Sequence, residues 1–266
     1  NTRLFDDAGI DGPPETLDEM LEIGAQLTKR DGAGNITQAG LTMGMTAQDH
    51  HWFREGLVRQ FGGEPYLNDY TTVNYNTPEG VSAMEFYVGL GEENGIGAVG
   101  FMDEPQAAFK AGRAGMHIDG SFRIGSLNKT RGLKWAVTEL PATGAGMRSN
   151  YSSYWVNAIT TKAEDEKYDA AVKFMQYVTS DEAMQIWLDV VGELPAKPSV
   201  GLTEANSNDA TYGPFIRGLA YANTTKFVNE SAQRQVLIDA VERVKLQGMS
   251  VADSLAIAAA AEQELL

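Results

Sequence analysis

The sequence predicts an α/β protein built from helices and short buried strands. Apolar residues recur at helical spacing in several segments, most clearly over residues 233–247. Residues 41–45 alternate as strand residues do, and residues 116–118 form a brief run bounded by glycines, which is typical of a short strand. The chain has 266 residues, enough for one large domain or two smaller lobes.

The first third of the chain predicts helices separated by short connections. A helix is expected at Thr16, because Thr16 and Glu19 have the spacing of a capping box and an apolar stripe follows. Residues 47–63 predict a second helix that ends at a glycine pair, and a proline at position 78 begins a third. Residues 66–75 are rich in tyrosine and polar groups, which indicates a loop or a short hairpin.

The remainder of the chain alternates between predicted strands and helices. Residues 116–118 lead to Gly120 and Ser121, which end the strand and leave Phe122 at its tip. Residues 134–140 and 150–160 have the composition of further strands. The remaining expected helices cover residues 164–178, a segment capped by Ser180, residues 213–222 and 233–247, and a last segment capped by Ser250. In helix 164–178 the residues expected to face inward are Tyr168, Ala171, Val172, Phe174, Met175 and Val178.

Composition excludes several classes of function. The formal net charge of −15 argues against a nucleic-acid partner, which needs clustered Lys and Arg, and against docking on an anionic membrane surface. An acidic surface suits a neutral or cationic ligand. The chain has no cysteine, so it forms no disulfide and has no thiolate ligand for a metal.

The sequence carries none of the common catalytic motifs. There is no G-x-S-x-G elbow, no H-E-x-x-H and no Walker A segment. The string G-x-G-x-x-G at residues 95–100 follows a helix and lacks a preceding strand, so it does not predict a dinucleotide site. No metal or other cofactor is predicted, because the adjacent His50 and His51 are expected to point in different directions and His117 is the only other histidine.

Aromatic and short polar residues gather instead at the ends of predicted strands and helices. Sugars need that combination, because their C–H faces stack on rings and their hydroxyls bond to planar polar groups. Trp52, Phe122 and Tyr154 or Trp155 are the candidate rings. The candidate polar partners are His50, Arg54, Asp119, Ser121 and Arg123. For each ring the alternative is ordinary packing in the core or over the surface.

At residues 107–127 the sequence AAFKAGRAGMHIDGSFRIGSL brings a resemblance to a known family. Its pattern AF..G.AGM...GSF resembles the signature of extracellular solute-binding proteins that feed sugars to ABC importers, the maltodextrin-binding type. The segments NTRLFDDAGID, PPETLDEMLEIGAQLT and AAVKFMQYVTSDEAMQIW also resemble family segments, in the same order along the chain. Phe122 stands where the family usually has tryptophan, which keeps an aromatic platform but makes it smaller.

The resemblance implies where a ligand lies. In the sugar binders, segment 47–63 carries an aromatic that stacks on a sugar ring, and counting back from the glycine pair puts that role on Trp52. The segment that begins at residue 150 crosses between lobes beside the ligand, and here serines and aromatic residues replace the usual glycine. The expected ligand-binding residues are Trp52, His50, His51, Arg54, Phe122, Ser121, Arg123, Asp119, Ser153, Tyr154 and Trp155.

The resemblance also implies a fold, the periplasmic-binding-protein type of class II topology with two lobes. Residues 1–150 are expected to form the first part of the C-terminal lobe and residues 205–266 its closing helices. Residues 151–155 would cross between lobes, and residues 156–204 would be a remnant of the N-terminal lobe. Family members are expected to carry roughly 100 or more residues before the point that matches Asn1, so the N-terminal lobe is expected to be incomplete and the chain to be a fragment or an excerpt.

The implied function is non-catalytic, high-affinity binding of a sugar or oligosaccharide outside the cytoplasm, as a periplasmic protein or a cell-surface lipoprotein. The implied partners are the carbohydrate and the membrane permease subunits of an ABC transporter. Two alternatives remain open at this point. One is a carbohydrate-active enzyme, a glycoside hydrolase or a lyase, which turnover of an oligosaccharide would reveal. The other is a sensor or scaffold module that binds a protein partner through the acidic surface.

Overall fold

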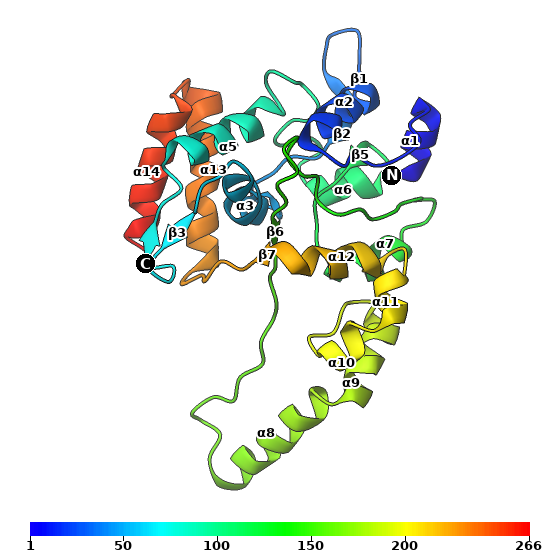
Figure 1. Ribbon diagram of the computed structural model, residues 1–266, viewed down its shortest axis with the longest axis vertical. Coiled ribbons are helices and arrows are strands. Elements are labelled where there is room, and N and C mark those ends of the chain that lie inside the picture. The colour runs from blue at the N-terminus through cyan, green and yellow to red at the C-terminus, as the bar shows by residue number, and fades with distance from the viewer.

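The computed structural model describes residues 1–266, which form a main body and an arm that projects from it (Figure 1). The arm holds helices α8 to α11, drawn in yellow-green and yellow, and the helices α13 and α14 at the end of the chain return to the body. The helices of the body and of its junction with the arm are α1 Thr2–Ala8, α2 Leu17–Leu27, α3 Asp49–His51, α4 Val58–Gln60, α5 Pro78–Gly89, α6 Pro105–Lys110, α7 Ile124–Asn128, α12 Tyr212–Gly218, α13 Glu230–Gln247 and α14 Val251–Gln263. The strands are β1 Lys29–Arg30, β2 Ile36–Leu41, β3 Tyr66–Leu67, β4 Thr72–Val73, β5 Ala114–Met116, β6 Asn150–Tyr151 and β7 Ala222–Asn223.

Two pairs of parallel strands direct chain segments toward one side of the body. Strand β2 pairs in parallel with β5, with Leu41 opposite Met116, and antiparallel with β1. Strand β6 pairs in parallel with β7, with Tyr151 opposite Asn223. Parallel strands end at the same edge of their sheet, which is where open α/β folds place their ligands.

Helix α2 packs closely against strand β2. Its N-cap is the expected capping box, in which Thr16 accepts from the Glu19 backbone N–H and the Glu19 carboxylate accepts from the Thr16 backbone N–H. A Cβ on Gly40 would overlap the Gly24 carbonyl oxygen, so this approach of helix to strand requires glycine at position 40.

The core of the body is organised around one helical segment that continues from α3 through α4. Between them, residues Trp52–Leu57 form a π-helical stretch, and every one of its residues is buried. Helices α5, α13 and α14 pack with it into one apolar cluster. Figure 1 draws α3 near the middle of the body, beside α13.

A buried ion pair ties this helical segment to the end of the chain. Arg54 Nη2 donates to Glu262 Oε2 at 2.8 Å, and neither side chain is exposed. Gln233 donates to the same carboxylate at 2.9 Å, and the hydroxyls of Tyr66 and Tyr75 donate to it at 2.5 and 2.7 Å. Burial opposes ionisation of Glu262, but Arg54 and these hydrogen bonds outweigh it, so the pKa of this carboxyl lies below its usual value.

Most predicted helices are confirmed, and most of the predicted strands are shorter or absent. Residues 134–140 form no strand, and only Asn150–Tyr151 of segment 150–160 pairs with another strand. The strand expected at residues 41–45 ends at Leu41, and Met43 makes only an isolated bridge to Val99. The sequences alternate as strands do, but a strand also needs a neighbour that accepts and donates its backbone hydrogen bonds.

The helices of the arm lack the interior predicted for them. The arm consists of α8 Asp165–Val178, α9 Asp181–Ile186, a second π-helical stretch Trp187–Val191, α10 Pro198–Gly201 and α11 Glu204–Asn208. No residue of α8 is buried, and the side chain of Phe174 is 63% exposed. The expected interior position is not reached: Tyr168 and Phe174 are exposed, and Ala171, Val172, Met175 and Val178 are only half-buried. No helix is both long and apolar enough to cross a membrane.

Candidate functional site

The candidate site is a cavity of about 1870 Å³ that is lined by residues of both the body and the arm. This volume exceeds the roughly 300–1,000 Å³ of typical small-molecule pockets, so it has room for several sugar rings. The segments that follow β2, β5, β6 and β7 lie around it, as the strand directions indicate. Helices α8 and α9 contribute Phe174 and Met184 from the arm.

A network of polar groups holds Arg123 at the edge of this cavity. Asp119 Oδ2 accepts from Arg123 Nε at 2.8 Å and lies 3.0 Å from His117 Nε2. His117 Nδ1 in turn lies 2.7 Å from the hydroxyl of Thr42. The guanidinium also lies over the ring of Phe122, with its carbon 5.0 Å from the ring centroid. Asp119 therefore orients Arg123, a residue of the cavity lining, through Nε and leaves the two terminal nitrogens of the guanidinium without a protein partner.

Three predicted rings lie at the cavity with exposed surface. Phe122 is 38% exposed, Tyr154 68% and Trp155 89%. Tyr154 and Trp155 lie on the extended segment that runs from β6 down to the arm (Figure 1). Ser121 and Ser153 also line the cavity. The structure thus brings together eight of the eleven predicted residues: His51, Asp119, Ser121, Phe122, Arg123, Ser153, Tyr154 and Trp155.

The other three predicted residues, Trp52, His50 and Arg54, do not line the cavity. Trp52 is 1% exposed and meets the ring of Tyr87 edge-on in the core. Arg54 is held in the buried pair with Glu262, and His50 is fully buried with its ring against that of His51. The burial of these three side chains contradicts the expectation that they face a ligand. Residues Trp52–Leu57 form a π-helical stretch, so the count back from the glycine pair, which assumes an ordinary helix, gives the wrong direction for Trp52.

The inner wall of the cavity contains two residues, Tyr151 and Gln48, that no sequence motif indicates. Tyr151 stacks on His51 with ring centroids 5.4 Å apart and an interplanar angle of 10°, and Gln48 lies one turn before His51. Burial lowers the pKa of His51 to about 4, and the charges of Arg54 and Arg234 add to this effect, so the imidazole is neutral at pH 7. Burial, together with the charges of Asp119 and Asp49, raises the pKa of the Tyr151 hydroxyl, which therefore keeps its proton.

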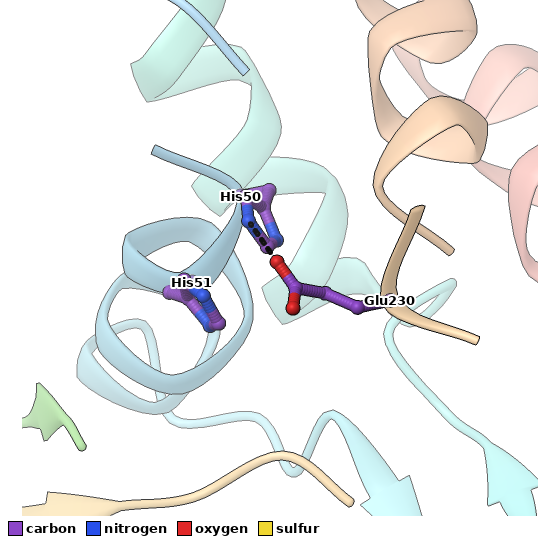
Figure 2. A group of neighbouring side chains, drawn as sticks. All are labelled: His50, His51 and Glu230. Atoms are coloured by element: carbon purple, nitrogen blue, oxygen red, sulfur yellow. Dashed lines mark ion pairs between the residues drawn. The ribbon is translucent and has the colours of Figure 1, made fainter. Parts of the chain in front are cut away.

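His50, His51 and Glu230 form a cluster beside this wall (Figure 2). Their potential ligand atoms all lie within 4.8 Å of one another, so the expectation that the two histidines point apart is wrong. Figure 2 shows His50 facing Glu230, with Nε2 3.9 Å from Oε1. However, Arg54 Nη1 points an N–H at His50 Nδ1, 3.4 Å away, where a metal-bound imidazole needs an acceptor for its own second N–H. Arg234, 3.8 Å from Glu230, adds a second positive charge.

We therefore expect that zinc does not bind this cluster and does not change the melting temperature of the protein. Binding to the folded state would raise the melting temperature, and we expect a shift of less than about 1 °C at micromolar zinc. Differential scanning fluorimetry with and without zinc or cobalt measures this shift. An increase that disappears in Glu230→Gln would show that the cluster does bind a metal.

Signals for the missed residues were present in part. Gln48 lies within the segment AQDHHWFREGLVRQFGG, where a strand end leads into a helix start, and such starts often meet a ligand. Tyr151 precedes the serines of the crossover, where the local pattern predicts only a strand residue. The stacking of Tyr151 on His51 cannot be predicted from the sequence, because this contact joins residues 100 positions apart.

Comparison with known proteins decides the family. The sequence matches the family described as bacterial extracellular solute-binding protein over residues 1–214, most of its length. The chain belongs to this family. The resemblance noted in the sequence is thereby confirmed. No curated protein sequence matches this solute-binding chain.

Solved structures share the fold of this solute-binding chain. An ABC transporter solute-binding protein from Thermotoga lettingae, bound with α-D-tagatose, is 20% identical with a TM-score of 0.84, and the match covers all of this chain and 68% of that one. The maltose/maltodextrin-binding domain MalE from Bdellovibrio bacteriovorus, bound to maltotriose, is 22% identical with a TM-score of 0.77, covering 96% and 68%. UgpB from Mycobacterium tuberculosis, in complex with glycerophosphocholine, is 17% identical with a TM-score of 0.76, covering 100% and 66%. The α/β fold of the periplasmic binding type is therefore confirmed.

Proposed function

We propose that this chain binds a sugar or an oligosaccharide without chemical conversion and belongs to the extracytoplasmic part of an ABC importer. The observation that carries the proposal is a large cavity with three exposed rings, Phe122, Tyr154 and Trp155, next to the fixed Asp119–Arg123 pair. Family membership and the sugars bound in two of the structural neighbours support it.

Each part of the cavity suits a different part of a sugar. The aromatic faces are the surface on which the C–H side of a pyranose packs. Asp119 accepts hydrogen bonds and the terminal nitrogens of Arg123 donate them, so the pair matches two adjacent hydroxyls. Because Asp119 is already held by His117 and the Gly120 backbone N–H, this pair is organised before a ligand arrives.

Residues 1–150 and 205–266 would then form one lobe and residues 156–204 part of the other, with residues 151–155 as the connection. The extended form of that connection and the position of the cavity between body and arm support this division (Figure 1). Binding would close the two parts around the sugar, and the closed form would be the one that permease subunits accept. A lipid anchor outside the cytoplasm fits the same role.

The proposal predicts that Trp155→Ala and Tyr154→Ala each weaken sugar binding by about threefold to tenfold, the value of one aromatic contact. A glycan array on the 266-residue chain identifies the ligand, and isothermal titration calorimetry measures the affinities. Tyr177→Ala is the matched control, because Tyr177 is an exposed aromatic of α8 outside the cavity. Equal affinities for all variants, or absence of any glycan hit, would contradict the proposal.

A further inference from the structure

The basic side chains of the cavity are all paired with carboxylates, whereas some of its acidic side chains have no partner. Each basic side chain that lines it has a carboxylate partner: Arg123 has Asp119 at 2.8 Å, Arg234 has Glu230 at 3.8 Å, and Lys226 has Asp69. Three acidic side chains of the lining, Asp6, Asp11 and Glu193, take part in no ion pair. The cavity therefore offers no free positive side chain to a ligand carboxylate and holds negative charge that would repel one.

Two of the lining residues carry buried polar atoms without a hydrogen-bond partner. They are the side-chain oxygen of Gln48 and the hydroxyl of Tyr151. The other such atoms belong to His50, Trp52, Arg54 and Gln60, none of which lines the cavity. An unpaired buried polar group costs about 1–3 kcal/mol, so its presence calls for a physical reason.

A sugar hydroxyl suits this cavity in two ways: it carries no negative charge, and it can pair with the free polar atoms of Gln48 and Tyr151. It donates one hydrogen and accepts through its oxygen, so it pairs with a tyrosine hydroxyl and with either orientation of a glutamine amide. A carboxylate only accepts, and it would lie near Asp119 and Asp49, whose charges already act on the Tyr151 hydroxyl.

We propose that the cavity selects neutral sugars over acidic ones, with Gln48 and Tyr151 forming an inner subsite that pairs with sugar hydroxyls. This inference rests on the proposed function and adds the class of sugar. The stacked rings of His51 and Tyr151 hold the tyrosine in place at the inner wall. Gln48 approaches from the start of the helical segment that carries His51.

The first test compares each neutral sugar found on the array with its uronic acid, for example galactose with galacturonic acid. Calorimetry at low salt is expected to show at least tenfold weaker binding of the acid, because the unpaired carboxylates of the lining repel a ligand carboxylate. Glu193→Gln is expected to narrow this difference by raising affinity for the acid. Glu166→Gln, a charge change on α8 outside the cavity, is the control and is expected to leave both affinities unchanged.

The second test is Tyr151→Phe, which removes only the hydroxyl. Affinity for the neutral sugar is expected to fall about tenfold, while the melting temperature of the free protein stays the same or rises, because the hydroxyl has no partner before binding. Tyr177→Phe is the matched control and is expected to change neither value. A purely structural hydroxyl would lower the melting temperature and leave affinity unchanged.

The outcomes separate this inference from the proposed function. If no sugar of either charge binds, the proposed function itself is wrong. If neutral sugars bind but uronic acids bind as tightly, or if Tyr151→Phe keeps full affinity, only the inference made here is overturned.

Discussion

Arg54→Ala is expected to lower the free energy of unfolding by about 3–5 kcal/mol, because it leaves Glu262 charged and buried without its partner. The guanidinium also donates to the backbone carbonyl of Gln233 at 2.7 Å, so the change affects both α13 and α14. Urea unfolding followed by circular dichroism measures the loss. A loss below 1 kcal/mol would show that the pair contributes little.

A matched control for this change is Arg3→Ala. Arg3 also pairs with a carboxylate, Asp7, at 3.3 Å, but both side chains are about half exposed. Exposed pairs contribute roughly 0–1 kcal/mol, so this variant is expected to unfold at nearly the urea concentration of the parent protein.

The same pair makes stability depend on pH in a defined direction. Since the pKa of Glu262 is lower in the folded protein than in the unfolded chain, the unfolded chain binds the proton more readily. The contribution is complete above the ordinary carboxyl pKa of 4.5 and is lost as pH falls through the lower folded value. Repeating the urea series in Glu262→Gln isolates this part of the acid sensitivity.

The chain is expected to self-associate through its arm. Large apolar side chains of the arm face solvent, among them Phe174, Trp187 and Val190. Exposed patches of this kind drive association or bind apolar dyes. Analytical ultracentrifugation is expected to show oligomers at micromolar concentration, together with strong fluorescence of the dye ANS.

Charge placed on that surface is expected to reverse the association. The double variant Phe174→Glu with Val190→Glu is expected to sediment as a monomer with reduced dye binding, because each carboxylate resists burial in an apolar contact. Leu246→Glu is the control, since Leu246 is an exposed side chain on α13 rather than on the arm. A parent chain that sediments as a monomer with a sharp melting transition would contradict this expectation.

Local signals in the sequence predicted the helices well. The capping box at Thr16, the proline that begins α5 and the caps at Ser180 and Ser250 all lie where expected. These features depend on residues within one or two turns, which a sequence displays directly. Strand pairing depends on distant partners, and this is why residues 134–140 alternate as a strand does without forming one.

The candidate site was predictable where side chains follow from strand ends, as for Asp119 and Phe122. It was not predictable for Trp52, because a π-helical turn has no distinctive sequence pattern and the residue count from the glycine pair assumes an ordinary helix. The unpaired atoms of Gln48 and Tyr151 are likewise a property of packing, visible only once the neighbours are placed.

The π-helical stretch has a consequence for how this protein can change. Gln48 and His51 line the cavity, whereas Asp49, His50 and residues 52–57 belong to the interior. Substitutions of Gln48 and His51 can therefore change which solute is held, whereas substitutions of residues 52–57 act on folding. The widened turn thus marks a boundary on one continuous helix, with selection for the bound solute acting before it and selection for folding acting after it.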